Sequence, residues 1–524
     1  MLAARPHAGQ RDLSTLPFHP ILAAAYPVIY LFAANAAEQV TLRPLWGPLL
    51  AAIGGAVAAL VLLRLLLGDW RIAGLLTTVL VVGFFGYGHA WNLLAGALPN
   101  QWPFLAVWLV AVAVAMVLAL RARRVAAEAT RALNLVAILA LLLNAGGLIG
   151  SVGALASSDP LPADAAPGLE LAPPDDAGLP DVYYVILDRY AGSTALRETY
   201  DFDNEPFLTA LEDRGFHVAR HAHSNYIKTP FSLASSLNID LLDVEALEAE
   251  ATDGKDREPA HRLLRRHLLV PAALKELGYA YLHIGNWWTP SADNVDADRT
   301  FVYDGQDEFT TVLAQTTLLR AITEPEAAPD DPWDWRVLRE HTLYAIDTLA
   351  ETADVEGPKF VFAHLLIPHD PYVFDADGSF MDRTQVARQG QPESYRRHLS
   401  YANARMLEIV DRILERSPDA VIMLQGDEGP FPARYRQDEW GFDWREATDA
   451  ELEEKFGILY AMRVPGADLD AHGFHDALTP VNAFRIIFNA RFGTDLELLP
   501  DRTWAHRDLY HFYDFFEITD RLAR

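Results

Sequence analysis

The sequence contains no cysteine. This absence excludes disulfide bonds, zinc sites built from thiolates and a cysteine nucleophile. Because a chain without cysteine is compatible with either an oxidising or a reducing compartment, this feature does not indicate where the protein is located.

Basic residues are scarce relative to acidic ones. The chain has 43 Lys and Arg against 71 Asp and Glu, which gives a formal net charge of -28. Nearly all of the acidic excess lies after residue 156, and no basic stripe interrupts it. A nucleic acid or another polyanion binds through clustered positive charge. We therefore expect no nucleic-acid partner.

Long apolar runs are confined to residues 1–155. A bilayer core of about 30 Å needs roughly 20 apolar residues in a helix. Five segments approach or exceed this length, so we predict a transmembrane anchor of five helices with membrane lipid as its partner. Pro20 and Pro27 interrupt the first segment, for which a cleaved signal peptide is the alternative. The segments are approximately Phe18–Ala37, Leu45–Leu67, Ile72–Leu94, Phe104–Leu120 and Leu133–Leu155.

The loop arginines predict the orientation of this anchor, because cytoplasmic loops are enriched in Lys and Arg. The two loops on the opposite side offer only Arg43. The N-terminus is then cytoplasmic, and five crossings place everything after Leu155 outside. We therefore predict a multi-pass cell-membrane protein with an extracytoplasmic C-terminal domain. The arginines on the predicted cytoplasmic side include Arg5, Arg11, Arg121, Arg123, Arg124 and Arg131.

A linker and a large domain follow the anchor. Residues 156–180 are rich in Pro, Ala and Asp without hydrophobic periodicity, which is typical of a linker. In residues 181–524, apolar strand-like runs alternate with helical patterns, as at Tyr395–Arg416. This alternation predicts an α/β sandwich with a mostly parallel sheet. The strand-like runs are Asp181–Asp188, Lys359–Leu366 and Ala420–Gln425.

Side chains that can bind a metal or act in catalysis lie at or just after the ends of these runs. Asp188 ends the first run, His369 follows the second, and Asp427 and Glu428 follow the third. Ligands of open α/β sheets bind beyond the carboxyl ends of the strands. Each residue taken alone fits an ordinary cap or turn, but their coincidence at one edge favours a site.

Thr229 is the candidate nucleophile. Pro230 is a natural first residue of a helix, which predicts Thr229 as its N-cap. The free N–H groups and dipole at such a helix end favour an anionic phosphoryl or sulfuryl group. Ordinary capping is the alternative role for this threonine.

Together, Asp188, Thr229, Asp427 and Glu428 would form an all-oxygen metal site. Oxygen ligands suit a hard divalent ion. We therefore predict one divalent metal ion, with Mn or Mg favoured over Ca or Zn.

The sequence resembles the alkaline phosphatase superfamily, in its sulfatase-like, lipoteichoic-acid-synthase-like membrane-anchored branch. The resemblance covers roughly residue 181 to the C-terminus and implies an alkaline phosphatase-like fold. It implies that Asp188 is a metal carboxylate, Thr229 the nucleophile, and His369 a contact to the substrate phosphate or leaving group. The motifs that carry it surround Asp188, Thr229–Leu237, Pro368–Tyr372, Gly426–Pro430 and Thr479–Asn489.

One position departs from that family pattern. Glu428 stands where the family usually has the histidine of an Asp-His metal pair. A carboxylate makes the site harder and more anionic, which disfavours zinc. His472, His475 and Asp476 could supply a second metal position, although a plain polar loop is favoured there. For His283 and His364, a structural role is favoured.

The resemblance implies a metal-dependent hydrolase or transferase acting on phosphoryl, less readily sulfuryl, esters of a lipid or envelope glycan. The substrate would be lipid-linked or a polysaccharide. Formylglycine sulfatase chemistry is disfavoured, because the chain lacks cysteine and no arginine follows Thr229-Pro230-Phe231. The alternative is a catalytically silent envelope scaffold or binding module, which the Glu428 departure supports.

Overall fold

The computed structural model describes residues 15–35, 42–94, 98, 100–156, 169–173, 178–265, 267–305, 308–323 and 334–522. The chain forms two compact units. The first, called here the helical unit, comprises Met1–Ser157 together with Gln306–Asp334. The second, called here the α/β unit, comprises Ser158–Gly305 and Trp335–Arg524. Most of the predicted linker lies outside the described residues. The three-part division at residues 155 and 180 stays a prediction.

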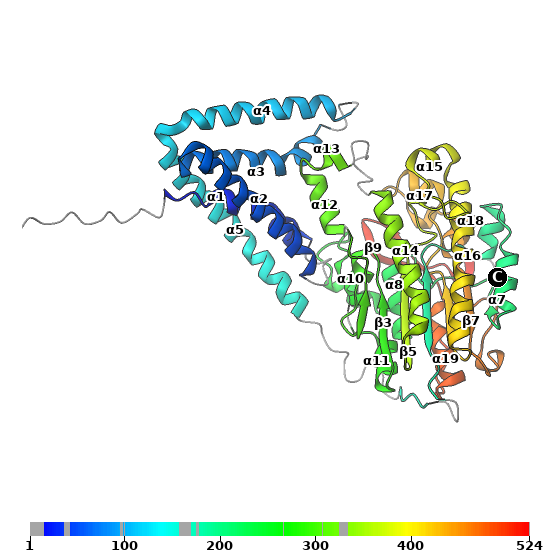
Figure 1. Cartoon of the computed structure of the whole chain (residues 1–524). Coiled ribbons are helices and arrows are strands. Elements are labelled where there is room, and N and C mark those ends of the chain that lie inside the picture. Colours follow the sequence, from blue (N-terminus) through cyan, green and yellow to red (C-terminus); the bar gives the residue numbers. More distant parts are fainter. Residues whose placement is uncertain are drawn as a thin grey trace, which may run out of the picture. The chain divides into compact units, whose positions relative to one another are not determined.

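Each of the five apolar segments is helical in the helical unit (Figure 1). Two helical stretches of the described residues, Pro44–Leu67 and Trp102–Asn144, are long and apolar enough to cross a membrane by length and composition. Two shorter apolar helices, His19–Ala34 and Trp70–Phe85, accompany them. The count of five crossings therefore stays a prediction. The helices are α1 (His19–Ala34), α2 (Arg43–Leu67), α3 (Trp70–Asn92), α4 (Trp102–Arg121) and α5 (Ala126–Ala156).

A seven-stranded sheet forms the centre of the α/β unit, in the order β2-β7-β6-β1-β5-β3-β4. Strands β6, β1, β5, β3 and β4 run parallel, whereas β7 is antiparallel to both β6 and β2. The predicted mostly parallel sheet is confirmed. The strands are β1 (Val182–Leu187), β2 (His217–Val218), β3 (Ala280–Ile284), β4 (Arg299–Phe301), β5 (Lys359–Leu365), β6 (Val421–Gln425) and β7 (Tyr460–Arg463).

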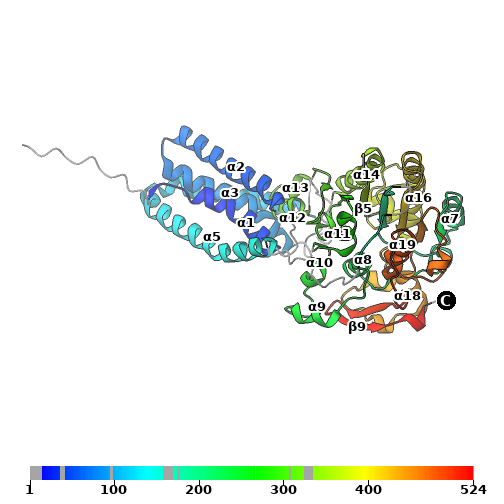
Figure 2. The same cartoon turned by 90° about the horizontal axis from the view of Figure 1, so that it is seen from below.

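Strand β1 is central and buried on both faces. Alternate residues of a strand point to opposite faces of the sheet. Tyr183, Val185 and Leu187 accordingly join one hydrophobic core, while Tyr184 and Ile186 join the other. The first core includes residues of α14 (Trp335–Glu351) and α16 (Gln391–Arg416), and the second includes residues of α8 (Thr229–Asn238), α11 (Leu269–Glu276) and α19 (Ala483–Arg491). Figure 2 shows these two groups of helices on the two sides of the sheet.

Shorter elements complete the two units. A two-stranded antiparallel sheet is formed by β8 (Trp504–Asp508) and β9 (His511–Glu517). Helices α12 (Glu308–Thr316) and α13 (Arg320–Thr323) belong to the helical unit, although they lie between β4 and α14 in the sequence. The other helices of the α/β unit are α6 (Ser193–Glu198), α7 (Glu205–Glu212), α9 (Val244–Glu250), α10 (Glu258–Arg265), α15 (Arg383–Gln389), α17 (Ala433–Gln437) and α18 (Asp449–Phe456).

Candidate active site

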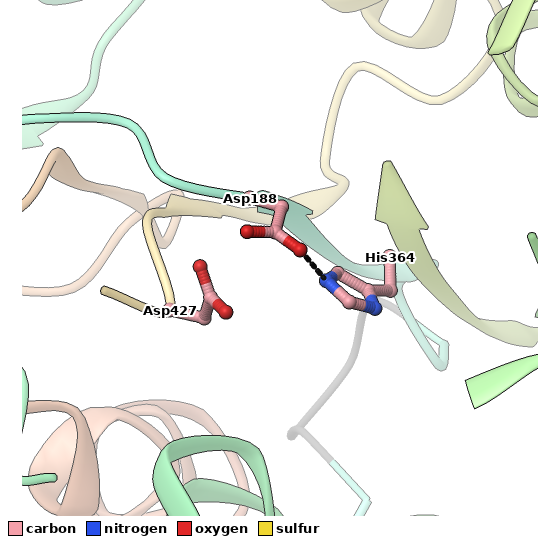
Figure 3. Close-up of side chains that lie close together, drawn as sticks. All are labelled: Asp188, His364 and Asp427. Atoms are coloured by element: carbon pink, nitrogen blue, oxygen red, sulfur yellow. Dashed lines mark hydrogen bonds and ion pairs between the residues drawn. The ribbon is translucent and has the colours of Figure 1, made fainter. Parts of the chain in front are cut away.

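Three neighbouring strands bring two carboxylates and an imidazole together. Ile186 of β1 pairs in register with His364 of β5 and with Gln425 of β6. Asp188 and Asp427, which follow β1 and β6, therefore reach the same edge of the sheet as His364. Figure 3 shows the three side chains close together. One ligand atom from each of Asp188, His364 and Asp427 lies within 4.8 Å of the others, and all three residues are buried.

Hydrogen bonds orient this acidic–imidazole triad. His364 Nε2 lies 3.1 Å from Asp188 Oδ2, and His364 Nδ1 lies 2.8 Å from Ser291 Oγ. The side-chain amide of Asn286 donates to the backbone carbonyl of His364 at 2.8 Å, which fixes the main chain that carries the imidazole. Asp427 Oδ1 accepts from the Arg189 backbone N–H at 3.1 Å.

The electrostatics of the triad favour a bound cation. Burial and the nearby Asp188 and Glu428 carboxylates raise the pKa of Asp427 to about 7. Burial opposes ionisation of Asp188 as well, but His369 and His364 outweigh it and hold the Asp188 pKa below its usual range. Asp188 Oδ1 and Asp427 Oδ2 are buried without a hydrogen-bond partner among the described residues. Buried polar atoms are normally satisfied, so these two oxygens fit a divalent ion.

Thr229 lies beside the triad. Its hydroxyl interacts with Asp427 and lowers the pKa of that carboxyl. Helix α8 begins at Thr229, and Lys228 is its N-cap. The residue thus lies one position inside the predicted N-cap, because Lys228 already has the extended backbone that precedes a helix. The closeness of Thr229 to Asp427 does not depend on that shift.

Glu428 pairs with a basic side chain and is not one of the three residues of the triad. Its Oε1 lies 2.7 Å from Lys455 Nζ of α18 and 4.0 Å from Arg189 Nε. Lys455 also donates to the Gly429 carbonyl at 3.0 Å. Both side chains of the Glu428–Lys455 pair are almost fully buried. Burial nevertheless lowers the pKa of Lys455, to about 8. Glu428 thus pairs with a buried lysine through Oε1, whereas its Oε2 is buried without a hydrogen-bond partner among the described residues, so its role as a metal ligand stays a prediction.

Three cationic side chains surround the ring of Phe431. Lys455 Nζ lies 3.4 Å, Lys228 Nζ 4.1 Å and Arg189 Cζ 4.7 Å from the ring centroid. Lys228 also donates to the Tyr435 hydroxyl at 3.2 Å. Burial lowers the pKa of Lys228 well below its ordinary value. This basic cluster is adjacent to Thr229 in sequence and to the triad through Arg189, so it can hold an anionic oxygen beside Thr229.

His369 borders the site without joining the triad. Its side chain is 18% exposed, and its Nδ1 contacts the backbone carbonyl of Asp370. Burial, and then the positive charge of Arg189, lower the pKa of His369. Because Arg189 also pairs with Asp370, this loop is tied to the residue that follows Asp188. A partly exposed imidazole at this place can face a substrate oxygen.

The structure brings Asp188, Asp427 and Thr229 together, as the sequence predicts, and adds His364. Sequence reasoning favoured a structural role for His364. The available signal was an imidazole within an apolar strand that ends at the same edge as Asp188. The residues considered for a second metal position do not form a ligand cluster. His475 pairs with Asp501 at 3.0 Å, and Asp476 pairs with His221 at 2.5 Å. Within the described part of the chain, the triad is the one group of at least three His, Asp or Glu close enough to hold an ion.

Comparison with protein families supports the resemblance. Residues 235–452 match the family model described as Sulfatase. This part of the chain is similar to the sulfatase family. The match includes His364, His369, Asp427 and Glu428, whereas Asp188 and Thr229 precede it. The sulfatase-like resemblance predicted from the sequence is confirmed.

The chain also has distant structural neighbours among solved structures. The zinc complex of the C-terminal periplasmic domain of EptC from Escherichia coli is 13% identical, with a TM-score of 0.43, covering 67% of this chain and 96% of its own. Lipooligosaccharide phosphoethanolamine transferase A from Neisseria meningitidis is 12% identical, with a TM-score of 0.39 and coverages of 88% and 94%. The lipoteichoic acid synthase LtaP from Listeria monocytogenes is 12% identical, with a TM-score of 0.39 and coverages of 65% and 80%. At these scores the likenesses are too distant to assign an activity. A search of curated proteins found no match.

Proposed function

We propose that this protein is a metal-dependent phosphoester hydrolase or transferase of the sulfatase-like type, with Thr229 as its nucleophile. One observation carries the proposal: the buried Asp188–His364–Asp427 triad, whose two carboxylates have unsatisfied oxygens, lies next to a helix-terminal threonine. Perturbed ionisable groups gathered with a hydroxyl are typical of a catalytic site.

Asp188, His364 and Asp427, with the Thr229 hydroxyl, would hold one divalent ion. When bound, the ion would polarise the ester and lower the pKa of the hydroxyl. The imidazole changes the expected choice of metal. Carboxylates with one imidazole accommodate Mn or Zn as readily as Mg, so the triad does not support the preference over zinc that an all-oxygen site predicts.

The residues divide the chemistry among them. Thr229 loses its proton to water, and its oxygen forms a bond to phosphorus while the bond to the leaving oxygen breaks. Lys228 and Arg189 hold the non-bridging oxygens, and His369 gives a proton to the leaving oxygen. In the second step, a water or sugar hydroxyl attacks the same phosphorus and gives its proton to His369, while the bond from phosphorus to the Thr229 oxygen breaks and that oxygen regains a proton from water.

A membrane-anchored enzyme of this type would act on lipid-linked or envelope-glycan esters outside the cytoplasm. The apolar spans Pro44–Leu67 and Trp102–Asn144 support the anchor. A catalytically silent envelope scaffold is the second candidate. It is favoured by the buried Glu428–Lys455 pair, which stands where the family usually places a metal histidine.

Activity of the full-length protein tests the proposed function directly. We expect hydrolysis of bis(p-nitrophenyl) phosphate by protein supplied with Mn²⁺ or Zn²⁺, loss of that activity with EDTA, and recovery when the ion is returned. Measurement of nitrophenolate release separates the two candidates. A folded, metal-loaded protein that turns over no phosphoester supports the scaffold.

Replacement of His369 by alanine is expected to lower kcat by about 10²-fold, the usual scale of general acid–base help. Bound metal should be retained, because His369 lies outside the triad. Steady-state kinetics and metal analysis of the same sample check both points. His475→Ala removes an exposed imidazole elsewhere and should leave kcat unchanged. Loss of the metal in His369→Ala would recast His369 as a ligand.

The arginine distribution also predicts topology. A reporter that works only outside the cytoplasm, fused after Arg524, should be active, whereas the same reporter placed after Arg124 should not. Reporter activity in cells expressing each fusion measures this. If the Arg124 fusion alone is active, the orientation is reversed. If both fusions report the cytoplasm, the segment Leu133–Leu155, which lies between the two fusion points, does not cross the membrane and the count of five is wrong.

A further inference from the structure

A segment from within the sulfatase-family match packs on the membrane-type helices. The chain leaves the α/β unit after Gly305, forms α12 and α13, and re-enters that unit at Trp335. The excursion lies inside residues 235–452, which match the Sulfatase model. Figure 1 shows α12 and α13 beside the end of α3. Neither helix has the length of a membrane span.

One face of α12 is packed into the helical unit. Phe309 and Leu313 form a buried cluster with Val28, Phe32 and Leu45 of α1 and α2. The rings of Phe32 and Phe309 meet edge to face, with centroids 5.5 Å apart. Such apolar contacts fix α12 against both helices.

Backbone and polar contacts fix the same segment to α3. The Leu318 N–H donates to the Phe84 carbonyl at 2.8 Å, and Arg320 Nη1 donates to Asn92 Oδ1 at 2.8 Å. Gly88 permits this approach, because a Cβ there would lie 2.1 Å from the Gln315 carbonyl oxygen. The segment is therefore closely fitted to α3.

These contacts place α12 and α13 at one end of the helical unit. They involve the C-terminal half of α3 and the first turn of α2. Arg121, the last residue of α4, and Arg124, which follows it, lie at the other end. Trp46 and Trp102, each 53% exposed, lie in the first turns of α2 and α4, at the same end as α12. Exposed tryptophans mark the level of lipid headgroups.

The same segment also has two exposed aliphatic residues. Ile322 is 75% exposed and Leu319 is 39% exposed. Among large hydrophobic residues after residue 156 in the described ranges, none is more exposed than Ile322. In a water-facing element such exposure is unfavourable, whereas at the boundary of headgroups and acyl chains it is stabilising.

We propose that α12 and α13 form an interfacial membrane seat, which inserts Ile322 and Leu319 into the outer surface of the bilayer. The inference rests on the membrane anchor given under the proposed function. It gives the catalytic domain a second attachment to the membrane, through an insertion of its own fold, in addition to the connection after α5.

The absence of cysteine allows this seat to be tested with single labels. Ile322→Cys and Leu319→Cys would each carry a nitroxide in full-length protein reconstituted into nanodiscs of phosphatidylcholine and phosphatidylglycerol. Val110→Cys, 63% exposed in the middle of α4, is the standard for lipid, and Arg124→Cys is the standard for water. Because Ile322 is exposed, its substitution leaves the packed face of α12 intact.

Accessibility to oxygen and to a water-soluble nickel chelate gives the result. We expect an oxygen-to-nickel accessibility ratio at Ile322 several-fold above that at Arg124 and below that at Val110. A ratio at Ile322 equal to that at Arg124, with Val110 in lipid, overturns the seat and leaves the anchor standing. A label shielded from both reagents also overturns it, because protein then covers Ile322. Water-like values at Val110 overturn the anchor and the seat together.

Discussion

Replacement of Thr229 by alanine is expected to abolish phosphoester turnover while leaving the protein folded and metal-loaded. The attacking oxygen is lost, whereas Asp188, His364 and Asp427 remain. Thr229 is the first helical residue and Lys228 is the N-cap, so the cost in stability should stay below the roughly 1 kcal/mol of a lost N-cap. That is small against a typical net stability of about 5–15 kcal/mol. Initial rates and thermal melting of the same preparation measure both effects.

Two companion variants sharpen this result. Thr229→Ser retains the attacking oxygen and should keep part of the activity. Ser235→Ala removes another hydroxyl of α8, which donates to the Asp240 carbonyl at 2.8 Å, and should keep nearly all of it. Mass spectrometry of the wild type, quenched during turnover, should find the phosphoryl adduct on Thr229. A Thr229→Ala protein as active as the wild type would end the covalent mechanism.

The second large effect concerns the metal. Asp427→Asn should weaken binding of the ion by more than the roughly 10–100-fold that loss of an outer-shell partner costs. The amide cannot supply the charge that offsets the ion, and Asp427 belongs to the triad and has a buried oxygen without a hydrogen-bond partner among the described residues. Elemental analysis of the full-length protein after dialysis against each ion gives the occupancy directly, without an activity assay.

Glu428→Gln is the matched control, because it removes the neighbouring carboxylate in the same loop. Its oxygen pairs with Lys455, so we expect metal occupancy to be retained while stability falls. Breaking a buried ion pair costs about 3–5 kcal/mol, since one charge is left uncompensated. Equal loss of metal in Asp427→Asn and Glu428→Gln would return Glu428 to the ligand set. Full occupancy in Asp427→Asn would show that the assigned site is wrong.

The central strands could be predicted nearly to the residue. Residues Val182–Leu187 and Val421–Gln425 are uninterrupted apolar runs, which is what a strand covered on both faces requires. Asp188 and Asp427 followed from them, because the ends of parallel strands share one edge of a sheet. The sulfatase-like motifs added Thr229 and His369, and the positions of both in the structure are compatible with the roles assigned to them.

Long-range pairing could not be predicted in the same way. His364 reaches Asp188 only through the register of β1 with β5, and a histidine in a buried strand looks structural in sequence. The partner of Glu428 is Lys455 of α18, far along the chain, and no local pattern connects them. The sequence did not predict that α12 packs on the helices of the helical unit, because α12 has too few hydrophobic residues for a membrane span.

The triad takes His364 from β5, and Asp188 and Asp427 from positions one and two residues beyond the neighbouring strands β1 and β6. The separation of Asp188, His364 and Asp427 is therefore set by the register of the sheet and does not depend on the movement of surface loops. Central strands are normally among the last parts of a domain to open. An ion held there would exchange slowly with solution, and its release would follow side-chain rotation or global unfolding. The lifetime of the loaded state would then report the integrity of the domain core.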